Sequence, residues 1–580
     1  MRAMTSGRQP ILFLVSAHNG LSQRAWIALT ELGHDVVVAV VDSDSAMQAA
    51  VAENRPRLIV SPFLRRMIPE SIWSRHRCVV VHPGPVGDRG PSSLDWAISL
   101  GAPDWGVTVL EANGEFDAGE VLASRDFPMR DVGKTSLYRH EVRRAAIEAL
   151  LEALERVERG SSGVPAAGRA EGAVAGCARP LMRQDIRAID WESDCTDTVL
   201  RKLRAADGNP GVLDELAGVE FHLFGGHREG LLRGHPGEVI ATRDDAICRG
   251  TIDGAVWITH LKRRDTDSAR FFKLPAVSAL SLAGIEPAAP EVKVTPTERL
   301  CPEHTYRELS YSKSAGVGYL RFEFYNGAMS TEQCRRLREA YAYARAQADT
   351  RVIVLMGGSD YFSNGIHLNV IEAAEDPATE SWRNLNAIDD LVRDIVRTDS
   401  HVVISALGGD AGAGGVPFAL AADIVVARED VVLNPYYQHM GGLYGSEYWT
   451  YLLPRRVGAA TTARLTSAPF TPIGAAQAAR IGLIDDVFGA RLEAFRDRTR
   501  VLAERLAGDP GLERRLEQKR RRRARDERVK PLESYRSEEL ARSHACFFGP
   551  DTSYHEARRR FVYKTAGPAR ARDAAPRAAA

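Results

Sequence analysis

The chain has 580 residues, of which 44% are hydrophobic and 26% are charged, a balance typical of globular domains. Lysine and arginine together number 76, as do aspartate and glutamate, so no net charge draws the chain toward nucleic acid. The seven cysteines are scattered and form no CxxC pair, which argues against a disulfide framework and a structural zinc site. No apolar stretch approaches the roughly 18 residues of a membrane span, and the first is too short for a signal peptide. We therefore expect a cytoplasmic α/β multidomain protein with no membrane partner.

The first part of the chain, through residue 155, alternates short apolar runs with helical stretches. Continuous apolar runs separated by helices predict an open parallel sheet that is buried on both faces. The expected strands are residues 11–15, 35–41, 58–60, 79–81 and 107–110, and a helix is expected over 22–32. Ligands of such sheets bind at the carboxyl ends of the strands.

Composition changes predict where the chain divides. Residues 160–176 are rich in glycine, alanine and serine, and prolines recur through residues 286–302, as in linkers. Between them, a helix near 197–206 and alternating strands predict a small β-barrel-like domain. The expected parts are 1–160, 180–285, the linker 286–302, a second α/β domain over 303–490, helices over 491–564 and a disordered tail over 565–580.

A polar constellation follows the strand at residues 79–81. The strand delivers His82 to its carboxyl end, and a loop rich in proline and glycine follows over residues 83–90. Gly106-Val107-Thr108 and then Asp117 come later in the chain. A histidine aligned by an aspartate can stabilise a tetrahedral oxyanion and move a proton.

This constellation resembles that of the hydrolase-type formyltransferases that use 10-formyltetrahydrofolate. The resemblance covers roughly residues 10–155, and residues 183–210 resemble the start of that family's C-terminal barrel. It implies that His82 and Asp117 are the catalytic histidine and aspartate. It also implies a folate-binding loop that includes Phe63, Leu64, Arg65 and Ile68.

One position departs from the formyltransferase pattern. The family's catalytic asparagine aligns with Val80, which has no polar side chain. Asn19 and Asn113 are the candidates to replace it, and the pattern leaves open which residue does so.

Two glycine-containing turns in the C-terminal half each follow an apolar strand. They lie at residues 361–368 and 408–417, and the second begins a helix. Such turns can direct backbone N–H groups at one oxygen, and a helix N-terminus favours negative charge. They resemble the two motifs of the crotonase (enoyl-CoA hydratase/isomerase) superfamily, over about residues 310–490. The resemblance implies an oxyanion hole formed by the N–H groups of Ile366 and Gly414, in a crotonase-like ββα spiral domain.

The two hydratase glutamates are missing from this pattern. Pro417 and Tyr437 stand at their positions, so we do not expect hydration of an enoyl thioester. Tyr437 and Glu447 can form a new acid/base pair; equally, Glu447 can cap a helix beside a cluster of tyrosine and tryptophan. The residues leave both interpretations open, and also which of Tyr437 and Glu447 moves a proton.

The order of the parts, with residues 82–97 and 547–564, resembles the HypX (HoxX) family of hydrogenase maturation factors over nearly the whole chain. The resemblance implies formyl transfer from 10-formyltetrahydrofolate to coenzyme A, then decarbonylation of formyl-CoA to carbon monoxide and coenzyme A. It implies catalytic roles for His82, Asp117, Tyr437 and Glu447, no metal, small-molecule substrates and hydrogenase maturation proteins as partners.

Other interpretations remain. One is a formyltransferase or formyl-CoA hydrolase with another acceptor or product, and another is a scaffold for hydrogenase assembly without catalysis. The basic run at residues 519–525 predicts a solvated helix face; binding of coenzyme A phosphates is the alternative.

Overall fold

The computed structural model describes residues 9–165, 174, 176–298, 305–438, 440–467 and 471–565. The chain splits into two compact units, Met1–Asp214 with His222–Gly226 and Glu215–Phe221 with His227–Ala580. Nearly all of the predicted tail and parts of both predicted linkers lie outside the described residues, and the six-part division stays a prediction. Within the described ranges, no helix combines the length and apolar character that a membrane crossing requires.

The first unit contains a mixed six-stranded sheet in the order β2-β1-β3-β4-β5-β6. Its strands are β1 (Ile11–Val15), β2 (Val36–Val40), β3 (Leu58–Ser61), β4 (Cys78–His82), β5 (Asp104–Glu111) and β6 (Val121–Pro128). The four strands β2, β1, β3 and β4 are parallel, as predicted, whereas β5 and β6 are antiparallel additions. The pairing places His82 beside Thr108, so the end of β4 faces the middle of β5.

Helices cover this sheet and continue beyond it. They are α1 (Gly20–Glu31), α2 (Asp44–Asn54), α3 (Glu70–Trp73), α4 (Ser93–Ser99), α5 (Lys134–Leu137), α6 (Arg143–Glu158), α7 (Gln184–Arg187) and α8 (Thr196–Ala206). The apolar residues of β1 alternate between two cores. Ile11, Phe13 and Val15 join a core with α1 and α6, and Leu12 and Leu14 join one with α2.

The next sheet runs in the order β7-β8-β11-β10-β9, with β12 paired to β11. Its elements are β7 (Val212–Leu216), β8 (Val219–Glu229), β9 (Val239–Arg243), β10 (Ala246–Gly250), β11 (Ala255–Arg263), β12 (Leu274–Pro275) and the helix α9 (Ala276–Leu282). The sequence predicts a small barrel-like domain here. In the strand order of the described residues, the end strands β7 and β9 are not paired with each other.

The remainder of the second unit is built on two sheets. The larger has the order β13-β14-β15-β17-β19-β22 and the smaller the order β16-β18-β20-β21. The larger sheet contains β13 (Leu309–Ser314), β14 (Val317–Phe322), β15 (Val352–Met356), β17 (Val402–Leu407), β19 (Ile424–Ala427) and β22 (Asp486–Val487). The smaller contains β16 (Tyr361–Ser363), β18 (Asp410–Gly412), β20 (Val432–Asn434) and β21 (Ile473–Gly474).

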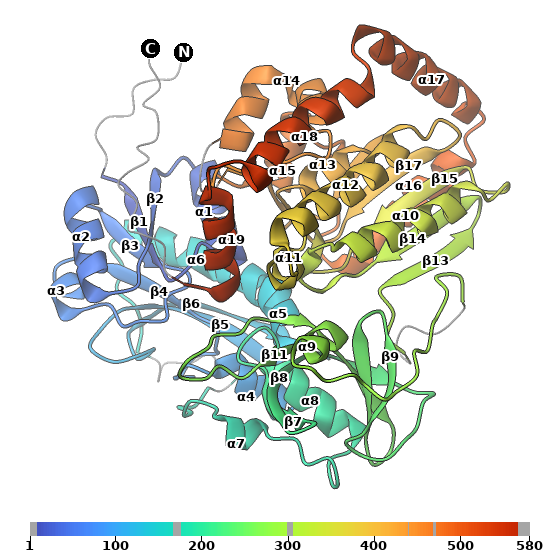
Figure 1. Ribbon diagram of the computed structural model, residues 1–580. Coiled ribbons are helices and arrows are strands. Elements are labelled where there is room, and N and C mark those ends of the chain that lie inside the picture. Colours follow the sequence, from blue (N-terminus) through green and yellow to red (C-terminus); the bar gives the residue numbers. More distant parts are fainter. Residues whose placement is uncertain are drawn as a thin grey trace. The chain divides into compact units, whose positions relative to one another are not determined.

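Ten α-helices accompany these sheets in the described part of the chain. They are α10 (Thr331–Arg345), α11 (Leu368–Ala373), α12 (Pro377–Val396), α13 (Gly415–Leu420), α14 (Trp449–Ser467), α15 (Ala475–Arg480), α16 (Leu492–Ala507), α17 (Leu512–Val529), α18 (Leu532–Phe548) and α19 (Ser553–Tyr563). The helices α10 and α12 lie side by side (Figure 1). They share a core with Ile353 and Leu355 of β15, while Val352 and Val354 face a second core with α16.

The basic run of α17 is largely ion-paired. Lys519 is buried, and its Nζ donates to the carboxylate of Asp423 at 2.5 Å and to the carbonyl of His401 at 3.0 Å. Arg520 and Arg521 both pair with Glu517 on the same helix. These contacts favour the helix-face interpretation over a phosphate site.

The two glycine turns meet because glycines allow close backbone approach. Gly365 adopts a φ of +77°, and a Cβ there would lie 3.2 Å from the nitrogen of Gly414. A Cβ on Gly415 would lie 1.9 Å from the carbonyl oxygen of Ser363. The turn after β16 is therefore pressed against the start of α13.

A Gly415→Ala substitution should push these turns apart and destabilise the fold by about 1–3 kcal/mol, as overpacking does in cores. Gly508→Ala is the matched control, because its Cβ would meet only ordinary contacts, the nearest at 3.5 Å. Thermal unfolding midpoints of both variants measure the difference. Equal midpoints would contradict the tight approach of the two turns.

Candidate active sites

The first site is centred on His82 at the carboxyl end of β4, where its side chain is buried. Both ring nitrogens contact carboxylates: Nδ1 lies 3.2 Å from Asp117 Oδ1, and Nε2 lies 2.9 Å from Asp88 Oδ2. Only glycine fits at position 84, since a Cβ there would lie 2.5 Å from His82 Nε2. The structure therefore brings His82 and Asp117 together and adds Asp88, which the sequence analysis did not select.

The two carboxylates are themselves fixed. Asp88 Oδ1 accepts a hydrogen bond from Arg179 Nη1 at 2.9 Å, and Asp117 Oδ2 accepts one from the N–H of Gly90 at 3.3 Å. Thr108 donates its hydroxyl to the carbonyl of Gly84 at 2.8 Å and so holds the loop that follows His82. Asp88 could have been selected from the sequence, because it is an acidic residue in the loop that directly follows His82. Arg179 lies 97 positions after His82, and nothing in the sequence indicated that it belongs to this site.

This arrangement favours a charged histidine. A neutral imidazole has one N–H and can donate to one carboxylate, whereas an imidazolium donates to both. Burial by itself lowers the pKa of His82, but the hydrogen bonds and charges of Asp117 and Asp88 outweigh it and raise the pKa to about 9. The site therefore holds a histidine cation at neutral pH.

The candidates to replace the missing asparagine have other roles. Strand alternation places Val80 on the same face of β4 as His82. Asn19 caps α1 by accepting the N–H of Ser22 at 3.0 Å, and Asn113 accepts the N–H of Glu115 at 2.9 Å. The polar group observed beside His82 is instead the Asp88 carboxylate.

The predicted folate loop follows β3. The Arg65 guanidinium lies over the Phe63 ring, 5.2 Å from its centroid, and this ring meets Tyr138 edge-on. Ile68 is buried, and Leu64 packs against the same core. Arg65 is exposed, so this loop presents an aromatic ring and a cation, a combination that suits a flat ligand with carboxylates.

The second site contains the two predicted backbone donors. Among the described residues, neither the N–H of Ile366 nor that of Gly414 has a hydrogen-bond acceptor. Gly414 is the N-cap of α13, where the helix dipole adds to the attraction for an oxyanion.

The side chains of Tyr437 and Glu447 meet at this point. Tyr437 donates its hydroxyl to Glu447 Oε2 at 3.0 Å, and the N–H of Ser446 donates to the same oxygen at 3.1 Å. A Cβ on Gly414 would lie 2.2 Å from Glu447 Oε1, so this oxygen faces the start of α13. No described residue donates a hydrogen bond to Glu447 Oε1, which leaves it available to a substrate.

The alternative interpretation of Glu447 is only partly matched. An aromatic cluster is present, with the Tyr437 and Trp449 ring centroids 6.5 Å apart. Glu447 does not cap α14, however, because the N–H of Thr450 donates to Glu539. Pro417 is buried within α13 and offers no acid or base.

Burial governs the electrostatics of this pair. Burial and the nearby charge of Asp389 raise the pKa of Glu447 to about 8, close to the value that suits a general base at neutral pH. Burial and the charge of Glu447 hold the pKa of Tyr437 well above its usual value. The phenol therefore stays a hydrogen-bond donor while Glu447 exchanges a proton.

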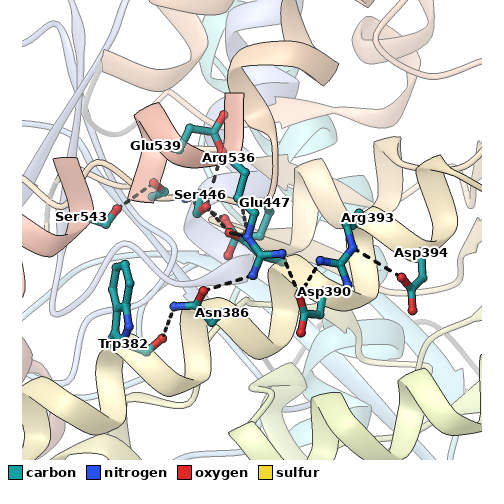
Figure 2. A network of polar contacts seen from close by, with 12 residues as sticks. Trp382, Asn386, Asp390, Arg393, Asp394, Ser446, Glu447, Arg536, Glu539 and Ser543 are labelled. Carbon is teal, nitrogen blue, oxygen red and sulfur yellow. Dashed lines mark hydrogen bonds and ion pairs between the residues drawn. The ribbon is translucent and has the colours of Figure 1, made fainter. Parts of the chain in front are cut away.

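A polar network behind Glu447 was not predicted from the sequence. Figure 2 shows Ser446 next to Glu447, Glu539 of α18 reaching Ser446, and Asn386 and Asp390 of α12 in contact with Arg536 of α18. One signal was present: Ser381, Asn384 and Asp389 fall among the inward-facing apolar positions of α12. Polar residues on such a stripe indicate a buried polar network.

Comparisons with known proteins match both halves. The sequence model of the family "Enoyl-CoA hydratase/isomerase" matches residues 312–546, and that of "Formyl transferase, C-terminal domain" matches residues 181–273. Methionyl-tRNA formyltransferase of Thermotoga neapolitana is 24% identical over 40% of this chain and 74% of its own length.

Two further proteins match almost from end to end. The hydrogenase maturation factor HoxX of Bradyrhizobium diazoefficiens is 47% identical over 96% of this chain and 94% of its own length. The crystal structure of HypX from Aquifex aeolicus in complex with tetrahydrofolic acid is 44% identical, with a TM-score of 0.90 over 96% of each chain. Because the HoxX relative is 47% identical over nearly the full length of both chains, the chain belongs to the HypX/HoxX family of hydrogenase maturation factors.

Proposed function

We propose that this protein produces carbon monoxide for [NiFe]-hydrogenase maturation in two steps. The first transfers a formyl group from 10-formyltetrahydrofolate to the thiol of coenzyme A, and the second decarbonylates formyl-CoA to carbon monoxide and coenzyme A. The observation that carries the proposal is Glu447 Oε1, which faces Gly414 beside two backbone N–H groups that have no acceptor in the described part of the chain. An oxyanion hole with a base beside it, and without the two hydratase glutamates, suits removal of a formyl proton.

In the first step, His82 acts as a buried cation held between Asp117 and Asp88. Its imidazolium stabilises the negative charge that develops on the formyl oxygen when the thiol sulfur attacks. The bond between the formyl carbon and N10 of the folate then breaks, N10 takes up the proton that the thiol gives up, and tetrahydrofolate leaves. Asp117 and Asp88 hold the ring, and Arg179 holds Asp88. The folate loop supports the donor through the Phe63 ring and the Arg65 charge, and the relative crystallised with tetrahydrofolic acid makes a folate donor the natural choice.

In the second step, the N–H groups of Ile366 and Gly414 hold the formyl oxygen. Glu447 Oε1 accepts the formyl proton, the carbon–sulfur bond breaks, and the departing sulfur takes a proton delivered through Tyr437. The carbon retains its oxygen and leaves as carbon monoxide, so no oxidant or reductant is needed. After this step Glu447 is protonated and Tyr437 has lost its proton. Glu447 then returns a proton to Tyr437 through their shared hydrogen bond, which restores both groups.

Purified protein with 10-formyltetrahydrofolate and coenzyme A tests the two steps together. We expect coenzyme A-dependent release of tetrahydrofolate and one carbon monoxide in the headspace for each formyl group used. Formate in place of carbon monoxide would indicate a formyl-CoA hydrolase. No coenzyme A-dependent folate release would favour a scaffold without catalysis.

Replacing Asp88 should change the pH dependence of formyl transfer. The imidazolium form of His82 is lost as pH rises through its pKa of about 9, so kcat/KM should fall on the alkaline side. The hydrogen bond and charge of Asp88 raise this pKa, so Asp88→Asn should move the alkaline limb to lower pH. Asp126→Asn on β6 is the control and should leave the alkaline limb in place. An alkaline limb that does not move in Asp88→Asn would show that Asp88 does not set the pKa of His82.

Changes at the second site should separate the two steps. Glu447→Gln and Tyr437→Phe should each slow carbon monoxide release from formyl-CoA by roughly 100-fold or more, the usual contribution of a general acid or base. Tetrahydrofolate release should continue in both variants. Tyr444→Phe, which alters another aromatic side chain next to Trp449, is the control. Carbon monoxide release at the parent rate in both site variants would contradict the roles proposed for Glu447 and Tyr437.

A further inference from the structure

Three buried carboxyl groups from different elements lie together behind the second site. They belong to Glu447 in the loop before α14, Asp389 on α12 and Glu539 on α18, and none is more than 2% exposed. Figure 2 shows Glu447 and Glu539 near Ser446, with Arg536 beside them. Asp389 accepts hydrogen bonds from Ser446 and from the Glu447 N–H. Glu447 has a role in the proposed reaction, whereas Asp389 and Glu539 do not.

Asp389 holds the backbone that carries Glu447. Its Oδ1 accepts the N–H of Glu447 at 2.7 Å, and its Oδ2 accepts the hydroxyl of Ser446 at 2.7 Å. Glu447 and Tyr448 have φ angles of +61° and +57°, a left-handed conformation that costs energy in residues with a Cβ. The Asp389 hydrogen bonds therefore stabilise a strained turn that aims Glu447 at Gly414.

Glu539 holds the same segment on its other side. Its Oε1 accepts the N–H of Thr450 at 2.8 Å and also the Thr450 hydroxyl. Its Oε2 lies 3.5 Å from the Ser446 hydroxyl oxygen. The segment from Ser446 to Thr450 is thus fixed between one carboxyl group of α12 and one of α18.

The hydroxyl of Ser446 faces two carboxyl groups but has one proton. If both groups were ionised, the hydroxyl could donate to only one of them, and the other would face a lone pair. If Glu539 is protonated, its O–H donates to Ser446 Oγ, which in turn donates to Asp389. In this arrangement the Glu539 carboxyl, the Ser446 hydroxyl and the Asp389 carboxylate each have a hydrogen-bond partner.

The charge around the cluster leads to the same arrangement. Arg536 makes its shorter contacts with Asp390 at 2.7 Å and Asn386 at 3.1 Å, and its Nε lies 3.9 Å from Asp389 Oδ2. One guanidinium already paired with Asp390 does not balance three buried carboxylates, and unpaired buried charge is costly. A proton held within the cluster reduces that charge.

We propose that Asp389, Ser446 and Glu539 are positioning residues for Glu447, and that the Ser446 hydroxyl shares one proton between Asp389 and Glu539. The role in catalysis rests on the proposed decarbonylation, whereas the shared proton stands on the geometry alone. The cluster keeps Glu447 aimed at the oxyanion hole and sets the pH at which it ionises.

The titratable groups around Glu447 support this assignment. Tyr437 faces it from the loop after β20, Asp389 from α12, and Glu539 with Arg536 from α18. The Cys334 thiol on α10 is also within electrostatic range. Burial raises the pKa values of Asp389 and Glu539, and the charge of Asp389 raises that of Glu447.

The pH profile of carbon monoxide release from formyl-CoA tests the positioning role. Glu447 acts ionised, so kcat should rise with pH through its pKa. Asp389→Asn removes the charge that raises this pKa, so the rising limb should move to lower pH by about one unit, the low end of the effect of a close like charge. Asp394→Asn, five residues along α12 and paired with Arg338, is the control and should leave the rising limb in place.

A second comparison addresses variants that lower activity only by loosening the loop. Glu539→Gln imitates the protonated carboxyl and should retain kcat at neutral pH, whereas Glu539→Ala should lose it. Ser446→Ala removes the shared hydroxyl and should move the rising limb of the pH profile of carbon monoxide release. Ser543→Ala removes a different hydrogen bond to this loop, to the Gly445 carbonyl at 2.9 Å, and should change the rate without moving the limb.

Infrared spectroscopy tests the shared proton without catalysis. In a Glu447→Gln background at neutral pH, we expect the absorption band of a protonated carboxyl group, which disappears when Glu539→Gln is added. Two results together would overturn this inference and leave the proposed function standing. They are a carboxyl band that persists after Glu539→Gln is added, and a rising limb of the pH profile that does not move in Asp389→Asn. Absence of carbon monoxide from the parent protein, with the band behaving as expected, would overturn the proposed function alone.

Discussion

The hydrogen bond from the Glu447 N–H to Asp389 is the contact on which the C-terminal site depends. It fixes two consecutive left-handed residues, and in that conformation the Glu447 carboxylate lies against Gly414. Gly414 in turn owes its place to the glycines that let the turn after β16 approach the start of α13. The base and the backbone donors are thus positioned by contacts that are continuous from α12 to the smaller sheet.

The two sites use burial in opposite ways. At His82, two carboxylates surround one cation, and their attraction overcomes the tendency of burial to remove its proton. At Glu447, carboxyl groups surround a carboxyl group, so burial and repulsion act together to retain a proton. The first arrangement suits a site that must stabilise negative charge on a formyl oxygen, and the second suits a base that must take a proton from carbon near neutral pH.

Much of the fold was predictable because long apolar runs mark buried strands. The predicted range for β1 matches the structure residue for residue. An apolar run does not reveal strand direction, so the antiparallel pairing of β5 was missed. The strands β16 and β18 have three residues each, too few to register as apolar runs. The resemblance to known families pointed to His82 with Asp117 and to Tyr437 with Glu447, and each pair is in contact in the structure. Asp389 and Glu539 are 150 positions apart, and only the packing of α12 on α18 makes them neighbours.

The depth of the acid cluster separates it from the surrounding electrolyte. Dissolved ions screen exposed charges over about 10 Å at 0.1 M salt, but they screen buried pairs much less. Asp389 and Glu539 are fully buried, whereas Arg65 in the folate loop is exposed to solvent. Changes in ionic strength therefore act on the capture of an anionic folate far more than on the proton equilibrium at Glu447. In the proposed reaction, the step that forms carbon monoxide is therefore insulated from the salt content of the medium, whereas the binding of the folate donor is not.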